Sequence, residues 1–222
     1  MRYTKLINKL GLQMWTLRDT MDTPENVRMT FRRMKELGYD IAQTAGCRIS
    51  YEDYARIAKE EGIEICGTHD DFDLMVNDIE KSIELHKILG TTNMGIGGFP
   101  CSTVEETEDF IVKANKIAAR IAKEGMKFTY HNHSNEFIRL PNGKIPMDML
   151  LEGLDPENTS FVLDTYWVQN AGGDVCTWIE KLKGRIDILH LKDMAVKYAE
   201  DSSKPVVKIV AYYPGNNNNS CS

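Results

Sequence analysis

The amino-acid sequence predicts an α/β fold of the (β/α)8 TIM-barrel type. Apolar strand candidates alternate with amphipathic helix candidates, and the connections between them are short, which is typical of parallel βαβ units. Glycines that end the helices recur at spacings of 24, 28, 35, 28 and 31 residues, close to one strand–helix unit each. An open doubly wound sheet is the alternative, but no GxGxxG motif follows the first strand.

The helices are predicted from their caps, their glycines and their apolar stripes. The best candidates are residues 23–38, 50–62 and 105–125. Thr23 and Ser50 suit the N-cap position, and Pro24 suits the first helical position. The helix-ending glycines, which can adopt positive φ, are Gly38, Gly62, Gly90, Gly125, Gly153 and Gly184. The apolar stripes are Val27, Phe31 and Met34 in the first helix and Phe110, Ile111, Ala114, Ile117 and Ile121 in the last.

Seven strand candidates lie between the helices, and an eighth follows them. They are residues 10–16, 39–45, 63–69, 92–98, 127–133, 160–167, 185–193 and 206–213. No amphipathic helix follows the eighth candidate, and a barrel typically takes about 250 residues. We therefore predict a single barrel over residues 1–213 that is incomplete or irregular at its eighth unit, followed by a disordered polar tail over 214–222.

Composition excludes several classes of protein. The 222 residues are 42% hydrophobic and 27% charged, as in an ordinary globular protein. The net charge of −6 comes from interspersed charges with no basic stripe, so we expect no nucleic-acid partner. No apolar run approaches the roughly 18 residues that span a bilayer. The five scattered cysteines and the absence of a secretory-signal pattern predict a cytoplasmic protein with reduced thiols.

Histidines gather at one end of the predicted barrel. The carboxyl ends of barrel strands and the loops after them form the active face. Four of the five histidines, His69, His131, His133 and His190, fall at such ends. The fifth, His86, lies in a helix and is expected to face solvent or a neighbouring layer.

Alternation along three successive strands predicts which side chains point into the barrel mouth. In residues 127–133 the histidines His131 and His133 share the inward face, while Phe128 and Tyr130 face the helices. By the same alternation Asp164 points inward, and so do His190 and Lys192. Imidazole and carboxylate groups together suit a divalent transition ion such as Mn, Zn, Fe or Co, so His131, Asp164 and His190 are predicted metal ligands.

Structural interpretations of these side chains stay open. An inward histidine at a barrel end can be a hydrogen-bonded structural group, Asp164 can cap the next loop, and Lys192 can form a solvated pair with Asp193. Trp15, Phe99 and Trp167 also sit at strand ends, where aromatic side chains can be ordinary core but in a barrel mouth commonly form the apolar wall of a ligand pocket.

Four motifs in order, LGLQMWTLRD, YHNHSNEF, FVLDTYW and ILHLKDM, resemble the xylose isomerase-like TIM-barrel proteins, also called sugar phosphate isomerases/epimerases, over about residues 9–195. The resemblance implies one divalent cation (Mn, Zn, Co or Mg) and a small carbohydrate substrate. The metal-binding Asp and His of the sixth and seventh strands match Asp164 and His190, and His131 stands where many members have Glu.

The family's fourth ligand, a Glu from the eighth strand, has no counterpart in the sequence. The change from KDMAVKYAEDSSKP to an Asn-rich end raises the hypothesis that the C-terminus is truncated or frame-shifted. Comparison of the intact mass with the coding DNA tests it.

The resemblance implies a metal-dependent isomerase or epimerase that removes a proton next to a carbonyl and passes through an enediolate. Alternatives are a dehydratase or lyase of the same superfamily, or a carbohydrate-binding barrel without catalysis. A metal-dependent endonuclease is disfavoured by the negative charge. A homo-oligomer is expected only by analogy with other such barrels.

Roles for individual side chains follow from position. The candidate acid/base residues are His133, Glu136 and Lys192, and Glu136 has a loop-surface position as its alternative. The candidate substrate contacts are Gln13, Trp15, Gln43, His69 and Trp167, with His69 expected on the wall opposite the acid/base candidates.

Overall fold

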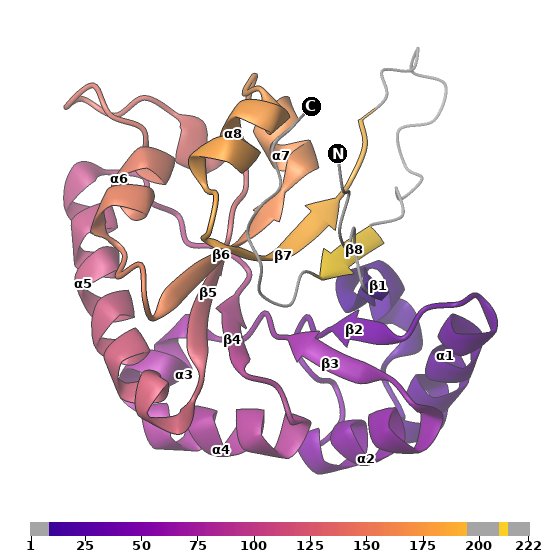
Figure 1. Ribbon diagram of the computed structural model, residues 1–222. Coiled ribbons are helices and arrows are strands. Elements are labelled where there is room, and N and C mark those ends of the chain that lie inside the picture. The colour runs from indigo at the N-terminus through magenta and orange to yellow at the C-terminus, as the bar shows by residue number, and fades with distance from the viewer. Residues whose placement is uncertain (1–8, 195–208, 213–222) are drawn as a thin grey trace, which may run out of the picture.

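The computed structural model describes residues 9–194 and the backbone of residues 209–212, and within them it contains one eight-stranded sheet (Figure 1). The order of its strands is β3-β2-β1-β8-β7-β6-β5-β4. The strands are β1 (Lys9–Gln13), β2 (Ile41–Gln43), β3 (Glu64–Gly67), β4 (Asn93–Ile96), β5 (Lys127–His131), β6 (Thr159–Asp164), β7 (Ile186–Leu191) and β8 (Ile209–Tyr212). Backbone N–H groups of Thr68 and Asp70 donate to the carbonyls of Asn93 and Gly95 and join the end of β3 to β4, which closes the barrel.

The predicted irregularity lies at the eighth strand. β8 runs between β1 and β7 and is antiparallel to both, whereas the described pairs among the other strands are parallel. The barrel prediction is therefore confirmed, with an eighth strand that runs in the opposite direction. The polar tail predicted over 214–222 and the rest of the C-terminal segment to which the truncation hypothesis refers lie outside the described residues.

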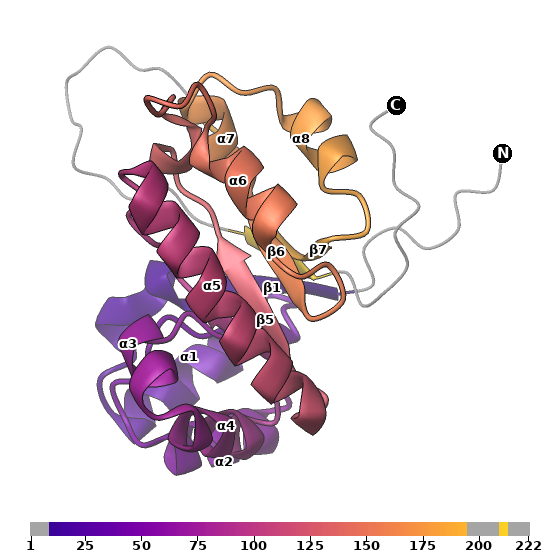
Figure 2. The ribbon, with the colours of Figure 1, turned by 90° about the vertical axis from the view of Figure 1, so that its left-hand side faces the viewer.

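Helices surround the strands on the outside of the barrel (Figures 1 and 2). They are α1 (Pro24–Glu36), α2 (Tyr51–Glu61), α3 (Phe72–Asn77), α4 (Ile79–Leu89), α5 (Val104–Ile121), α6 (Pro146–Gly153), α7 (Thr165–Asn170) and α8 (Val175–Lys181), with short 3-10 helices η1 (Met14–Thr20), η2 (Ala122–Glu124) and η3 (Asn135–Phe137). The predicted caps are confirmed, because the side chains of Thr23 and Ser50 accept hydrogen bonds from Asn26 N–H and Asp53 N–H. Gly62 and Gly90 end α2 and α4 in the left-handed conformation.

The strands β1 to β7 each end earlier than predicted, and after two of them a side chain caps a helix directly. The Gln13 side chain accepts a hydrogen bond from Trp15 N–H, and η1 begins at residue 14. The Asp164 side chain accepts one from Trp167 N–H, and α7 begins at residue 165. The aromatic residues Trp15 and Trp167 therefore lie on helices at the barrel mouth and not on strands.

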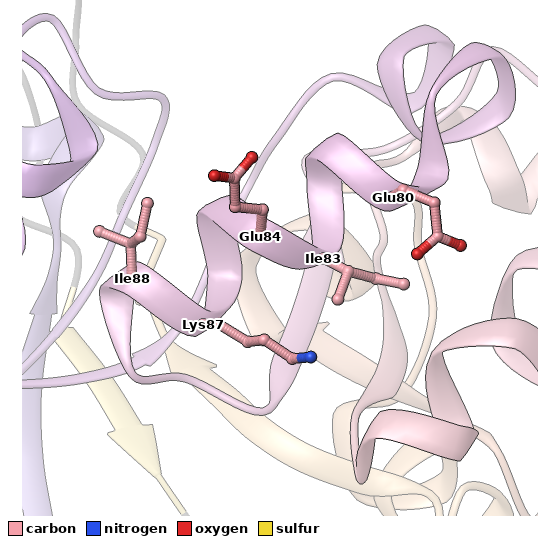
Figure 3. A pocket seen from close by; sticks show the side chains of 5 residues that line it. All are labelled: Glu80, Ile83, Glu84, Lys87 and Ile88. Atoms are coloured by element: carbon pink, nitrogen blue, oxygen red, sulfur yellow. The ribbon is translucent and has the colours of Figure 1, made fainter.

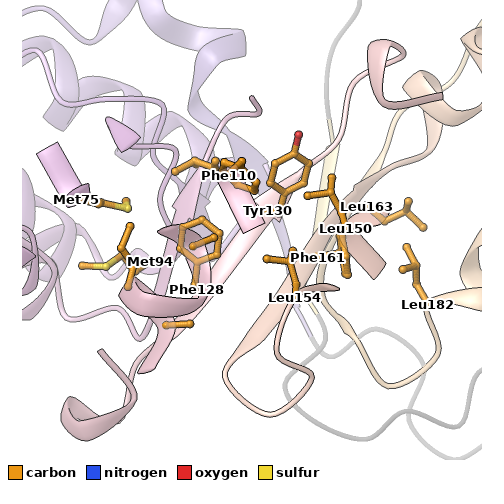
Figure 4. Close-up of a cluster of buried hydrophobic side chains, with 14 of the residues drawn as sticks. Met75, Met94, Phe110, Phe128, Tyr130, Leu150, Leu154, Phe161, Leu163 and Leu182 are labelled. Atoms are coloured by element: carbon orange, nitrogen blue, oxygen red, sulfur yellow. The ribbon is translucent and has the colours of Figure 1, made fainter. Parts of the chain in front are cut away.

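The main hydrophobic core lies between the strands and the helices (Figure 4). Phe128 and Tyr130 of β5 and Phe161 of β6 are completely buried there. Phe110 of α5 packs against them, with its ring centroid 5.4 Å from that of Tyr130. Each fully buried side chain of this size contributes about 1.5–3 kcal/mol to stability. This packing confirms the outward face predicted for β5 and turns its alternate residues toward the barrel axis.

The barrel interior is narrow and filled by a second set of side chains. Ile41, Cys66, Val162 and Ile188 form a small buried cluster there. Gly95 of β4 has no room for a side chain, since an added Cβ would lie 2.3 Å from the carbonyl oxygen of Thr68. In the described part of the chain, no helix has the length and apolar character needed to cross a membrane.

Candidate metal centre

His131, Asp164 and His190 converge at the carboxyl ends of β5, β6 and β7. All three are buried, and one potential ligand atom from each lies within 4.8 Å of the others. The Asp164 Oδ2 atom is 3.3 Å from His131 Nε2 and 3.4 Å from His190 Nδ1. Donor atoms that share a tetrahedral ion at about 2.1 Å are about 3.4 Å apart. Two of the three pairs of ligand atoms therefore have the spacing that a single divalent ion requires.

The remaining polar atoms of the three side chains are held by the protein. His131 Nδ1 lies 3.0 Å from the carbonyl oxygen of Gly97, and His190 Nε2 lies 2.6 Å from Gln43 Oε1. Both partners are acceptors, so we assign an N–H to His131 Nδ1 and to His190 Nε2. The other ring nitrogen of each histidine faces Asp164. Asp164 Oδ1 in turn accepts from Trp167 N–H. Metal-binding histidines typically have such a second partner, which fixes the tautomer and the ring.

The electrostatic environment keeps Asp164 ionised. Burial opposes the charge on this carboxyl, but hydrogen bonds from His131 and His190, made when the ring nitrogens that face it carry a proton, outweigh burial and hold the pKa of Asp164 well below its usual value. A divalent ion would take the place of those protons. An ionised carboxylate between two imidazoles supplies the negative charge that a divalent cation requires.

Lys192 lies beside this centre and is buried, so its interpretation as half of a solvated pair is wrong. Its Nζ atom is 3.9 Å from Asp164 Oδ2. It also lies 3.9 Å and 4.3 Å from the ring centroids of Tyr166 and Trp167. Cation–π attraction to two rings fixes the ammonium at the mouth.

The two remaining histidines of the mouth lie against His131. The ring centroid of His69 is 4.7 Å from that of His131 and 5.6 Å from that of His190, so His69 lies beside these two candidate ligands. The ring of His133 is 4.7 Å from that of His131 and 5.1 Å from that of Trp167. The structure thus brings together the four histidines that the sequence placed at strand ends.

The predicted substrate contacts differ in how far their side chains are buried. Gln43 is fully buried and orients His190, while its Nε2 atom has no hydrogen-bond partner in the described part of the chain. Gln13 Nε2 lies 3.3 Å from His69 Nδ1. Trp15 is half exposed, with the Arg18 guanidinium 4.8 Å above its ring. Substrate contact by these residues stays a prediction.

Glu136 is not on the loop surface, because its side chain is fully buried. Its carboxylate accepts hydrogen bonds from the Tyr130 hydroxyl at 2.7 Å and from His133 N–H at 2.9 Å. Burial raises the pKa of Glu136, against the effect of these hydrogen bonds. Since Tyr130 faces the helices, we assign Glu136 to positioning the loop that carries His133 and not to proton transfer.

Of the two positions that the sequence allows for Phe99, the structure shows the core and not the pocket wall. Its ring stacks on Phe110 at 4.6 Å and meets Phe72 at 5.5 Å, so it belongs to the core between strands and helices. The aromatic wall of the mouth is instead formed by Tyr166 and Trp167, next to Lys192.

His86 faces the neighbouring layer and not solvent, since it is buried between α4 and the end of β3. Its Nδ1 atom lies 2.7 Å from the Ser82 carbonyl oxygen, and its Nε2 atom lies 2.8 Å from Thr68 Oγ1 and 3.5 Å from Asp70 Oδ2. Burial lowers the pKa of His86 more than the nearby Asp70 raises it.

This burial predicts a loss of stability in mild acid. The folded pKa of His86 lies below the unfolded value near 6.5, so below that pH the unfolded chain binds a proton that the folded chain excludes. We expect the unfolding free energy to fall between pH 7 and about 5, by at most about 1.4 kcal/mol per pH unit from this group. Burial also raises the pKa of Asp70, which acts in the opposite direction at lower pH. Urea unfolding of wild type and His86→Gln checks this, and equal pH slopes would contradict it.

Two surface hollows contain none of the three candidate ligands. One of about 430 Å³ is lined by Glu80, Ile83, Glu84, Lys87 and Ile88 on α4 (Figure 3). The other, of about 30 Å³, adjoins the mouth and includes Trp15, Arg18 and Arg48. The candidate centre is therefore a set of side chains across three strand ends and not one of these hollows.

A model of the xylose isomerase-like TIM barrel family matches residues 31–215. The chain belongs to this family. The match covers β2 to β8, and so includes all three candidate ligands. The family assignment agrees with the resemblance that the four sequence motifs carry.

Curated relatives of this family member are named inosose dehydratase. One from Geobacillus thermodenitrificans is 31% identical over 100 residues, which is 45% of this chain and 33% of the relative. One from Clostridium tetani is 32% identical over 111 residues, which is 50% of this chain and 34% of the relative. The chain thus matches about a third of the length of these relatives.

Solved structures share the barrel. A sugar phosphate isomerase/epimerase from Parabacteroides distasonis superimposes with a TM-score of 0.72 and 24% identity, over 92% of this chain and 81% of the other. A probable 3-DHS dehydratase from Bacillus anthracis gives a TM-score of 0.66 and 16% identity, over 85% and 74%. At these identities the likeness supports the fold alone.

Sequence reasoning missed two polar residues, Asn132 and Thr165, which contact the backbone around the candidate ligands. Each directly follows a predicted ligand in the chain. A polar residue directly after a predicted ligand was the available signal, but its partner on the next strand was not visible in the sequence.

Proposed function

We propose that the chain carries the centre of a metal-dependent enzyme that removes a proton next to the carbonyl of a small keto-carbohydrate and then eliminates water. The cluster of His131, Asp164 and His190, with the Lys192 ammonium beside it, is the observation that supports this proposal. The relatives named inosose dehydratase favour elimination of water as the outcome.

A divalent ion held by His131, Asp164 and His190 would polarise the substrate carbonyl and stabilise the negative charge that develops next to it. The imidazoles of His69 and His133 border the same site and are the candidate bases for the C–H proton. As that proton leaves, its electron pair forms a C=C bond and the neighbouring C–O bond breaks.

Lys192 is placed to complete the elimination. Its ammonium can donate a proton to the departing hydroxyl, which leaves as water, and Asp164 and the rings of Tyr166 and Trp167 hold it there. The half-exposed Trp15 and the indole of Trp167 offer apolar faces for the carbon skeleton of a sugar or cyclitol.

Isomerisation or epimerisation is the second candidate. It shares the first proton transfer, but the proton returns to carbon and no C–O bond breaks. The likeness to a sugar phosphate isomerase/epimerase favours it at the level of the fold. A non-catalytic carbohydrate-binding barrel is the third outcome to test, since residues 202–222 contain no Asp, Glu or His that could supply the family's fourth ligand.

One experiment separates the three. The protein loaded with Mn²⁺ or Co²⁺ is incubated in D₂O with an inosose and with ketoses, and the products are followed by NMR and mass spectrometry. Loss of one water from the substrate is the expected result. Deuterium at the carbon next to the carbonyl without loss of water indicates isomerisation or epimerisation, and saturable binding with neither change indicates a binding protein.

A further inference from the structure

Two polar side chains occupy equivalent places beside the candidate centre. Asn132 directly follows the candidate ligand His131, and Thr165 directly follows the candidate ligand Asp164. Asn132 lies between His131 and His133, which supply polar groups to the mouth, and its own side chain is fully buried. Each of the two side chains reaches the backbone of the next strand.

Asn132 extends the pairing of β5 with β6. The parallel ladder between these strands ends at the pair His131 and Val162, so the peptide groups of Asp164 lie beyond it. Asn132 Oδ1 accepts a hydrogen bond from Asp164 N–H at 2.8 Å, and Asn132 Nδ2 donates to the Asp164 carbonyl at 3.4 Å. The amide side chain therefore satisfies both backbone groups of a candidate ligand.

Thr165 does the same between β6 and β7. The ladder there ends at the pair Asp164 and His190, because the chain of β6 turns into α7. The Thr165 hydroxyl accepts from Lys192 N–H at 3.0 Å. Its single proton can be donated to the carbonyl of His190 at 3.0 Å or to that of Lys192 at 2.9 Å.

We propose that Asn132 and Thr165 are positioning residues that hold Asp164, His190 and Lys192 in the register that one ion requires. The inference rests on the proposed function, because it assumes that the centre binds a metal. Without these side chains, buried backbone groups would lose their partners, which costs about 1–3 kcal/mol each and lets the strand ends move apart. Changes in groups that orient metal ligands typically weaken metal affinity about 10–100-fold.

The test measures the Zn²⁺ and Mn²⁺ affinities of the metal-free protein by calorimetry. Thr165→Val keeps the shape of the side chain and removes the hydroxyl, so we expect affinity to fall about 10–100-fold, and Thr165→Ser is expected to restore it. The metal affinity of Asn132→Ala is expected to fall by the same factor. The affinity of Asn132→Asp should lie between those of wild type and Asn132→Ala, because aspartate retains only the hydrogen-bond acceptor. The matched control is Thr107→Val, which removes a buried hydroxyl that donates to the Thr103 carbonyl on α5, and its affinity should equal that of wild type.

The absorption spectrum of the Co²⁺-loaded protein gives a second readout, because it reports the ligand geometry directly and should change in Thr165→Val but not in Thr107→Val. Unchanged affinity and spectrum in Thr165→Val and Asn132→Ala would overturn the inference and leave the proposed function standing. If Thr165→Val or Asn132→Ala does not fold, Asn132→Asp, whose affinity is expected to lie below that of wild type, decides on the same two readouts. A wild-type protein that binds no ion would overturn the proposed function, and this inference with it.

Discussion

Asp164→Asn is expected to abolish divalent-metal binding and activity while the fold stays intact. The substitution removes the only carboxylate of the described candidate centre, whose Oδ2 atom faces both histidines. We expect affinity to fall by more than about 100-fold, since changes that only reorient ligands already cost up to that amount. Asparagine can still accept the hydrogen bond from Trp167 N–H that starts α7, and it is as good an N-cap as aspartate.

Metal affinity by calorimetry and thermal unfolding without metal check this prediction together. The matched control is Asp174→Asn, which replaces the N-cap aspartate of α8, whose side chain accepts from Thr177 N–H. This control should bind metal like wild type. A normal metal affinity in Asp164→Asn would show that the carboxylate only caps α7.

Lys192→Met is expected to lower kcat by about 10²–10⁴-fold without weakening metal binding, because the ammonium is assigned to proton transfer and not to the ion. Methionine fills similar space and keeps contact with the rings of Tyr166 and Trp167. It also removes a positive charge 3.9 Å from Asp164 Oδ2, so metal affinity should stay equal or rise. The assay is the rate of water loss from the substrate, with metal affinity measured in parallel.

The control for Lys192 is another lysine of the same kind. Lys181 Nζ lies 4.5 Å from the ring centroid of Trp178 and pairs with Asp148, but it sits on α8 outside the candidate centre. Lys181→Met should leave kcat unchanged. Wild-type turnover in Lys192→Met would exclude Lys192 as the acid and leave the proton donor to the histidines of the mouth.

Strand alternation predicted which side chains form the candidate centre, because alternation depends only on local backbone geometry. Successive residues of β5 point to opposite faces, so the apolar Phe128 and Tyr130 fixed His131 on the inward face before any distance was known. The caps at Thr23 and Ser50 could be predicted for the same reason, since both ends of each hydrogen bond lie within three residues.

Features that join distant parts of the chain could not be predicted in this way. The position of His69 next to His131 depends on how β3 and β5 tilt around the barrel, and Glu136 is buried because it meets the Tyr130 hydroxyl behind the strand. The direction of β8 is also invisible in its residue pattern, because a short apolar strand pairs equally well with parallel and antiparallel neighbours. The contacts of Asn132 and Thr165 likewise span two strands.

The central claim is that His131, Asp164 and His190 form a metal site even though no acidic residue follows Asp201 in the sequence. Titration of the purified, metal-free chain with Zn²⁺ or Mn²⁺ in a calorimeter tests it most directly. We expect one ion to bind per chain in wild type and none in Asp164→Asn at the same concentrations. Binding that is absent in wild type, or identical in the two proteins, would contradict the claim.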